Sequence, residues 1–265
     1  MSTPAQVYAY RTLIVNLAQR DLKARYKRSV LGWLWSLINP AATLGIYTVV
    51  FGVILGAVGP TMGSGHKGVF ALYLFCALVV WNLFSGTINI AISSFQSAGG
   101  LLTRTYFPPE APMVAGLVNV LLQAVIEACI LMFFMIIVGN VSWTVIVIIP
   151  IFVLLACFAF GIGLVLAVYN IRYRDVAYLV GILLQVWFYA TPIVYEKSLI
   201  KSAAAQHFLD TNPMTHFVYA MRQSIYMLGT PTLVNWAVMT AAAIVSLIGG
   251  WMVFSRLAPR VIEEL

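Results

Sequence analysis

The sequence has little charge. Only 9% of its 265 residues are charged, whereas 62% are hydrophobic and the mean hydropathy is +0.95. A soluble domain of this length needs more charge on its surface, so the composition excludes one. It predicts an integral membrane protein with an all-α fold.

Catalytic and metal-binding motifs are absent as well. Neither HExxH nor GxSxG occurs, and Cys76, Cys129 and Cys157 stand far apart in apolar runs, so no disulfide framework or CxxC pair is available. Residues 63–68 (GSGHKG) resemble a phosphate loop, but Lys67 is followed by glycine and no strand is predicted before it. The chain is therefore predicted to be no enzyme and to hold no metal or cofactor, so that any ATP and Mg²⁺ bind to another chain.

Six apolar runs are each about the ~20 residues that cross a hydrocarbon layer of ~30 Å. The predicted spans are residues 40–58, 69–93, 112–138, 144–169, 176–195 and 233–254. They divide the chain into a cytoplasmic segment, 1–39, and a six-span region, 40–265. With the loops assigned alternately, eleven of the fifteen Lys and Arg residues lie on the side of the N-terminus. The positive-inside rule then predicts a multi-pass protein with both termini in the cytoplasm.

The segment before the first span combines a charged face with an apolar one. Cations recur at helical spacing, and the preceding turns carry an apolar stripe formed by Tyr10, Leu13, Ile14 and Leu17. This pattern predicts an amphipathic interfacial helix on the membrane surface. Asn39 and Pro40 are predicted to be the N-cap and the first-turn proline of span one.

A cluster of cations ends this segment, directly before a turn at Leu31 and Gly32. Its five members are Arg20, Lys23, Arg25, Lys27 and Arg28. They suit either of two roles: anchoring to anionic lipid at ~1 kcal/mol per charge, or binding phosphate groups, which need donors in a fixed arrangement. No DNA- or RNA-binding motif accompanies them, so nucleic acid is not a predicted partner.

Two predicted spans carry polar residues at helical spacing. They are Asn82, Ser85 and Asn89 in span two, and Asn119, Gln123 and Glu127 in span three. The favoured interpretation is that the two rows hydrogen-bond to each other and hold the spans together. The alternative is a hydrophilic path or a protonatable site, because an ionisable residue in hydrocarbon is costly.

Two loops are candidate functional surfaces. The cytoplasmic loop 99–110 has an apolar, aromatic tip at Arg104, Tyr106 and Phe107, predicted to be exposed and to dock a partner, or else to rest on lipid. In the external stretch 196–235, Asn212 and Pro213 open a short amphipathic helix that includes Arg222. That helix is either a re-entrant or lid element, or a surface helix that covers the ends of spans.

Aromatic residues at helical spacing are candidates for lining a channel along which sugar rings slide, although such stripes more often pack a core. They are Tyr47, Phe51, Tyr73, Phe84, Tyr178 and Tyr189, together with Gln185. The spacing of Gly52 and Gly56 in span one permits close helix approach, for example across the seam of a dimer.

Four stretches together resemble the permease subunit of bacterial ABC exporters that move lipid-linked polysaccharides, such as O-antigens, teichoic acids and galactan. They are RDLKARYKRSVLGWLW (20–35), NIRYRD (170–175), TPIVY (191–195) and NPMTHFVYAMR (212–222). Their order and spacing extend over nearly the whole chain, and the first is the most specific.

The resemblance implies six spans, a homodimer in the bacterial inner membrane and two copies of a separate cytosolic ATPase. It also implies a lipid-headgroup entrance at Leu31 and Gly32, an ATPase-coupling element near 104–107, and gating helices between spans five and six. The expected function is export of a polyprenyl-diphosphate-linked polysaccharide. The alternatives are an exporter of a drug or small lipid and, with less support, a membrane scaffold without transport activity.

Overall fold

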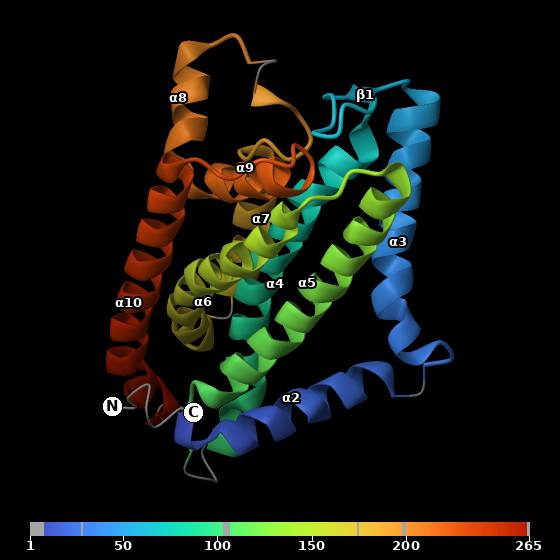
Figure 1. Cartoon of the computed structure of the whole chain (residues 1–265). Coiled ribbons are helices and arrows are strands. Elements are labelled where there is room, and N and C mark those ends of the chain that lie inside the picture. The colour runs from blue at the N-terminus through green and yellow to red at the C-terminus, as the bar shows by residue number, and fades with distance from the viewer. Residues whose placement is uncertain (1–7, 28, 103–106, 174, 198–199, 264–265) are drawn as a thin grey trace.

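The computed structural model describes residues 8–27, 29–102, 107–173, 175–197 and 200–263, and it is a bundle of helices (Figure 1). The N-terminal half contains α2 (Arg11–Tyr26), η1 (Gly32–Leu34), α3 (Trp35–Tyr47), the π-helix η2 (Thr48–Ile54), α4 (Phe70–Leu102) and α5 (Ala111–Val138). The C-terminal half contains η3 (Trp143–Val147), α6 (Ile148–Arg172), α7 (Val176–Tyr189), α8 (Ala203–Thr211), α9 (Pro213–Ile225) and α10 (Leu233–Glu263). Two short antiparallel strands, β1 (Val58–Gly59) and β2 (Gly68–Val69), join η2 to α4.

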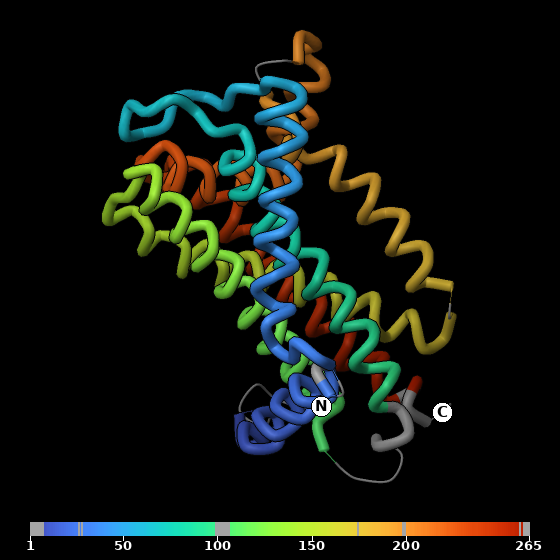
Figure 2. The backbone as a smooth tube through the Cα atoms, turned by 90° about the vertical axis from the view of Figure 1, so that its right-hand side faces the viewer, coloured from blue at the N-terminus to red at the C-terminus, as the bar shows by residue number. Residues whose placement is uncertain are grey.

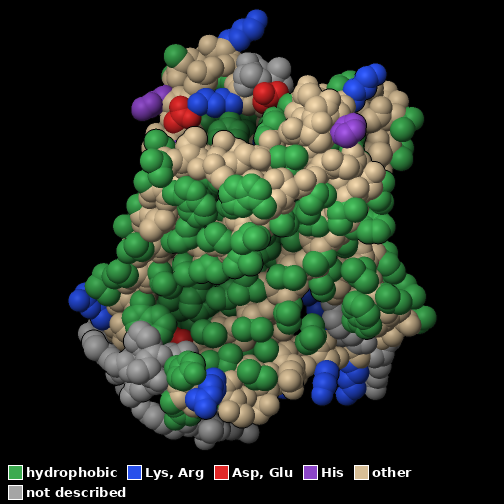
Figure 3. Space-filling model, in the orientation of Figure 1, with side chains coloured by type: hydrophobic (Ala, Val, Ile, Leu, Met, Phe, Trp, Pro, Cys, Tyr) green, Lys and Arg blue, Asp and Glu red, His purple; other side chains and the backbone are tan. Residues whose placement is uncertain are grey.

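Among the described residues, five helices are long and apolar enough to cross a membrane. They are Gly32–Ile54, Phe70–Ala98, Ala111–Val138, Trp143–Arg172 and Leu233–Pro259. In the space-filling view, hydrophobic side chains cover the middle of the molecule and charged ones lie mainly at its two ends (Figure 3). The prediction of an all-helical membrane fold is confirmed at this level.

The predicted fifth span is shorter than expected. Residues 176–195 were predicted to cross the membrane, but α7 ends at Tyr189 after 14 residues, a rise of only about 21 Å. Residues 190–195 form turns instead. The count of six spans therefore stays a prediction.

The long helices surround α4, which is the most deeply buried of them. It packs against α5 and α6, and α6 packs against α10. The α6–α10 crossing depends on glycine, because a Cβ at Gly250 would overlap the backbone of Gly161. The Ser246 hydroxyl also donates to the Phe158 carbonyl across this crossing, at 2.7 Å. By contrast, a Cβ added at Gly52 or Gly56 would meet no described residue of this chain within 4 Å.

The predicted start of span one at Asn39 and Pro40 is wrong. Helical structure begins at Gly32, so Pro40 lies inside α3. Proline has no backbone N–H, and the Ser36 carbonyl four residues earlier therefore loses its usual helical donor. The Gln123 amide of α5 donates to that carbonyl at 3.1 Å. The bundle thus supplies a hydrogen bond that the helix itself lacks, as neighbouring helices do around membrane prolines.

Helix α2 crosses the base of the bundle, and the chain turns sharply from it into α3 (Figure 1). Helix α3 runs along the height of the bundle, and α7 stands at one edge of it (Figure 2). The base of α10 lies at the same end of the molecule as α2. At the opposite end lie α8, α9 and the β1–β2 hairpin (Figure 1).

Candidate functional site

The apolar side of α2 packs on the protein itself. Ile14, Leu17 and Ala18 form one buried cluster with Phe107 and two alanines of α5, with Tyr10 and Leu13 packed against it. The sequence assigns this stripe to the membrane surface, whereas the structure covers it with the start of α5. The opposite side of α2 remains exposed.

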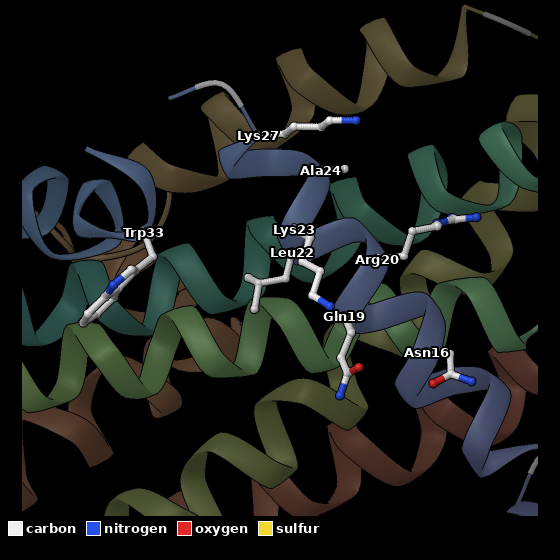
Figure 4. Close-up of a pocket in the computed structure, with 8 residues that line it drawn as sticks. All are labelled: Asn16, Gln19, Arg20, Leu22, Lys23, Ala24, Lys27 and Trp33. Atoms are coloured by element: carbon white, nitrogen blue, oxygen red, sulfur yellow. The ribbon is translucent and has the colours of Figure 1, made fainter. Parts of the chain in front are cut away.

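The exposed side of α2 lines an open pocket with a volume of about 850 Å³. Figure 4 shows its eight lining residues, which are Asn16, Gln19, Arg20, Leu22, Lys23, Ala24, Lys27 and Trp33. We call this space the outer pocket. Three of the five predicted cations line it, and Arg20 also pairs with Asp21 at 2.9 Å.

Arg25 lines a different, smaller space of about 200 Å³. Its walls come from the end of α2, the beginning of α3 and the middle of α5, and its lining is Arg25, Ser29, Trp35, Ser36, Asn39 and Gln123. We call this space the inner pocket. It combines a guanidinium with hydroxyl and amide groups, and none of the described residues that line it is acidic, so its chemistry suits an anion. The predicted cation cluster is thus divided between two sites.

The polar row of α5 connects three other helices. Asn119 donates to the Ala18 carbonyl of α2 at 3.1 Å, and Gln123 donates to the Ser36 carbonyl of α3. Glu127, which is buried, accepts from Asn82 of α4 at 3.0 Å. The predicted contact between the two polar rows therefore occurs at Asn82 and Glu127.

The other two residues of the α4 row form no such contact. The Ser85 hydroxyl donates to a carbonyl of its own helix, that of Trp81, and no hydrogen bond to α5 is recorded for Asn89, which is exposed. Whether the polar row also lines a path stays a prediction.

At the other end of the molecule, Arg222 of α9 is buried, with only 3% of its surface exposed. Its guanidinium donates to the carbonyls of Pro192 at 2.7 Å, Ile193 at 2.6 Å and Tyr73 at 3.2 Å. Its Cζ also lies 3.7 Å from the centre of the Tyr73 ring. Burial lowers the pKa of this guanidinium, but arginine titrates so far above neutral pH that the charge remains. Arg222 therefore fastens the turn after α7 to α9 and α4.

Asn212, at the start of α9, holds the same turn. Its Oδ1 caps α9 by accepting from the Met214 N–H, and it also accepts from the Trp187 indole at 3.1 Å. Its Nδ2 donates to the Ala190 carbonyl and to the Thr191 hydroxyl, both at 3.1 Å. The stretches 191–195 and 212–222, far apart in the sequence, thus form one unit.

The far end of α9 is capped from the loop after α5. The Asn140 amide donates to the carbonyls of Ile225 and Tyr226, both at 3.0 Å, and the Thr144 hydroxyl donates to that of Ser224 at 2.6 Å. These bonds satisfy carbonyls that a helix end leaves without partners. Sequence reasoning missed Asn140 and Thr144, since neither belongs to a periodic pattern or a motif.

The sequence profile described as ABC-2 type transporter matches residues 12–226, well over half of the chain. This chain belongs to the ABC-2 type transporter family. It is similar to the O-antigen export system permease protein RfbA of Myxococcus xanthus, with 30% identity over 223 residues and 83% of each chain covered. An RfbA of Klebsiella pneumoniae is 26% identical over 260 residues, or 96% of this chain and 95% of that one. The polysialic acid transport protein KpsM of Escherichia coli is 23% identical over 220 residues, or 78% of each.

The predicted coupling surface of this ABC-2 transporter differs from the expectation. Arg104 and Tyr106 lie outside the described residues. Phe107 was predicted to be exposed, but only 8% of its surface is, because α2 covers it. The prediction of an exposed Phe107 is therefore wrong, and its side chain links the base of α5 to α2.

The proposed channel residues of α4 lie inside the chain. Tyr73 and Phe84 are both buried. The Phe84 ring stacks on Phe158 with centroids 5.5 Å apart, and the edge of Trp187 meets it at 5.0 Å. Tyr47 and Phe51 pack against the same core and are partly buried.

The α7 residues of the set lie on an open face. Tyr178 and Tyr189 are 77% and 65% exposed, and Gln185 between them is exposed as well. Their spacing places them along one side of α7. A role in lining a channel stays a prediction for all seven residues.

Of the other predicted entrance residues, Leu31 and Gly32 form the turn that begins η1. Gly32 has a φ of +52°, a left-handed conformation that favours glycine. Arg28 lies outside the described residues. The sequence did not single out Ser29 and Ser36, which complete the inner pocket with Arg25, because isolated serines carry no pattern.

Proposed function

We propose that this chain is the membrane-spanning subunit of an ATP-driven exporter that moves a polyprenyl-diphosphate-linked polysaccharide out of the cytoplasm. The observation that carries the proposal is the likeness, over 78–96% of the chain, to permeases named for O-antigen export and polysialic acid transport. The chain itself is a transport subunit rather than an enzyme.

The proposed assembly contains two copies of this chain in the bacterial inner membrane and two copies of a cytosolic ATPase, which bind ATP and Mg²⁺. Membership in the ABC-2 family supports the ATPase partner. The position of α2 and the end of α10 at the same end of the bundle supports two cytoplasmic termini. The segment 104–106 is proposed to meet the ATPase, and the unit formed by 191–195 and 212–222 to form the outer gate.

The inner pocket is the proposed receiving site for the substrate's diphosphate. It lies beside the turn at Leu31 and Gly32, where η1 begins, at the same end of the bundle as α2. Arg25 offers a planar pair of donors suited to a phosphate, while Ser29 and Asn39 add neutral hydrogen-bonding groups. The outer pocket is wider and more exposed, which suits loose attraction to anionic headgroups.

Arg25→Lys tests this assignment, since lysine keeps the charge but loses the bidentate geometry. In reconstituted complexes with the ATPase, we expect substrate-stimulated ATP turnover to fall roughly tenfold at low substrate concentration, the equivalent of one charge-assisted hydrogen bond at about 1.4 kcal/mol. Membrane insertion and ATPase assembly should be unchanged.

Arg20→Lys is the matched control, because Arg20 lies on the outer side of the same helix, and it should behave as the unaltered protein does. Equal stimulation in both variants would remove Arg25 from the substrate site. A different outcome would favour the small-molecule exporter: ATP turnover of the unaltered complex would rise with a drug or a simple lipid but with no polyprenyl-diphosphate-linked glycan.

A further inference from the structure

Span one contains a carbonyl that lacks its usual helical donor. In α3, the N–H of residue 40 would normally donate to the Ser36 carbonyl, but residue 40 is proline. Ser36 is buried, so a carbonyl left there without its helical donor is costly. The Ser36 carbonyl can therefore accept a hydrogen bond from outside its helix, on the side that faces α5.

The side chain of Gln123 fills this opening. Its Nε2 donates to the Ser36 carbonyl at 3.1 Å and also lies 3.5 Å from Glu127 Oε1. The other oxygen of Glu127 accepts from Asn82. A chain of polar groups thus runs from α3 through α5 to α4.

The same residues line the inner pocket. Ser36 and Gln123 form part of its wall, as do Asn39, directly before the proline, and Arg25 of α2. The distance between α3 and α5 therefore determines how much space remains in front of Arg25.

We propose that Gln123 is a positioning residue for the inner pocket: by taking the carbonyl that Pro40 leaves open, it tethers α3 to α5 and sets the width of the pocket. The assignment of a diphosphate ligand to this pocket rests on the proposed function, whereas the tether itself does not. In this role Gln123 fixes the position of α3 and does not itself contact the substrate.

Two substitutions distinguish the two roles of Gln123, which are to hold α3 against α5 and to supply a donor to the Ser36 carbonyl. Gln123→Leu removes the donor, so we expect lower thermal stability and an apparent KM for lipid-linked substrate, measured by ATPase stimulation, about tenfold higher, with the maximal rate unchanged. Adding Pro40→Ala gives the Ser36 carbonyl a donor within its own helix. The double variant should therefore regain stability while its KM stays high, since α3 is still not tied to α5.

Recovery of both stability and KM in the double variant would overturn the proposal, because Gln123 would then only satisfy the carbonyl. An unchanged KM in Gln123→Leu would overturn it as well. Asn119→Leu is the matched control one turn earlier in α5. Its acceptor, the Ala18 carbonyl, keeps the helical donor Leu22, so Pro40→Ala should have no effect on that variant.

A distance measurement tests the tether without any substrate. Spin labels at Ile38 and Leu122, both exposed, should give a narrow distribution in the unaltered protein and in Pro40→Ala. The distribution should broaden in Gln123→Leu and in the double variant. A narrow distribution in Gln123→Leu would overturn the tether. A broad distribution in Gln123→Leu would support the tether. If, in addition, no polyprenyl-diphosphate-linked glycan stimulated ATP turnover by the unaltered complex, the tether would stand and the proposed function would be rejected.

Discussion

Replacing Arg222 by methionine should cause a large loss of stability at the outer end of the protein. Two buried carbonyls, those of Pro192 and Ile193, would lose their donor at once, whereas that of Tyr73 keeps a helical donor within α4. Each such loss costs about 1–3 kcal/mol, so the sum is several kcal/mol. Thermal unfolding in detergent measures the loss, and limited proteolysis should show faster cleavage within residues 190–211.

Arg256→Met is the matched control, because Arg256 is exposed and removing its charge should have little effect on the melting temperature. Arg222→Lys should fall between the two, since one ammonium cannot reach three separated carbonyls as a guanidinium does. A melting temperature unchanged by Arg222→Met would mean that the turn after α7 is held by other contacts, with Asn212 first among them.

Gly250→Ala should separate α6 from α10 and give a second large loss. The added Cβ would overlap the Gly161 carbonyl, and backbone cannot move aside as a flexible side chain can. Overpacking of side chains costs about 1–3 kcal/mol, and we expect at least the upper end here. The yield of folded protein after membrane extraction and its melting temperature report the effect.

The neighbouring residue provides the control for this experiment. A Cβ at Gly249 would meet nothing within 4 Å, so Gly249→Ala changes the same sequence by the same group without a clash. Similar yields and melting temperatures for the two variants would show that the α6–α10 crossing tolerates a wider separation than the structure has.

Several features could be predicted because they depend on local sequence. The apolar runs locate the long helices, since the ~30 Å hydrocarbon layer sets their length directly. The row Asn119, Gln123 and Glu127 could also be identified, because helical periodicity places the three side chains on one face. Asn212 and Pro213 mark the start of α9 through capping chemistry that is likewise local.

The predictions that failed concern contacts between distant segments. Phe107 is an apolar residue on a loop, and only the position of α2 decides whether it is exposed. Pro40 was assigned to a helix start because an isolated helix would break there, but Gln123, 83 positions away, supports the open carbonyl. For the same reason the motif could not single out Gly161 and Gly250, which form the close crossing without matching it, and packing of Gly52 and Gly56 against a second copy of the chain stays a prediction.

The difference in length between α7 and α10 has a consequence for the surrounding lipid. The 14 residues of α7 rise about 21 Å, whereas the 27-residue apolar stretch of α10, Leu233–Pro259, rises about 40 Å. The protein therefore presents two hydrophobic thicknesses to one bilayer. Lipids beside α7 must thin or pack with shorter acyl chains, while α10 can fit by tilting. Bilayer thickness should thus bias the orientation of the whole bundle, and export should depend on acyl-chain length even where headgroups are identical.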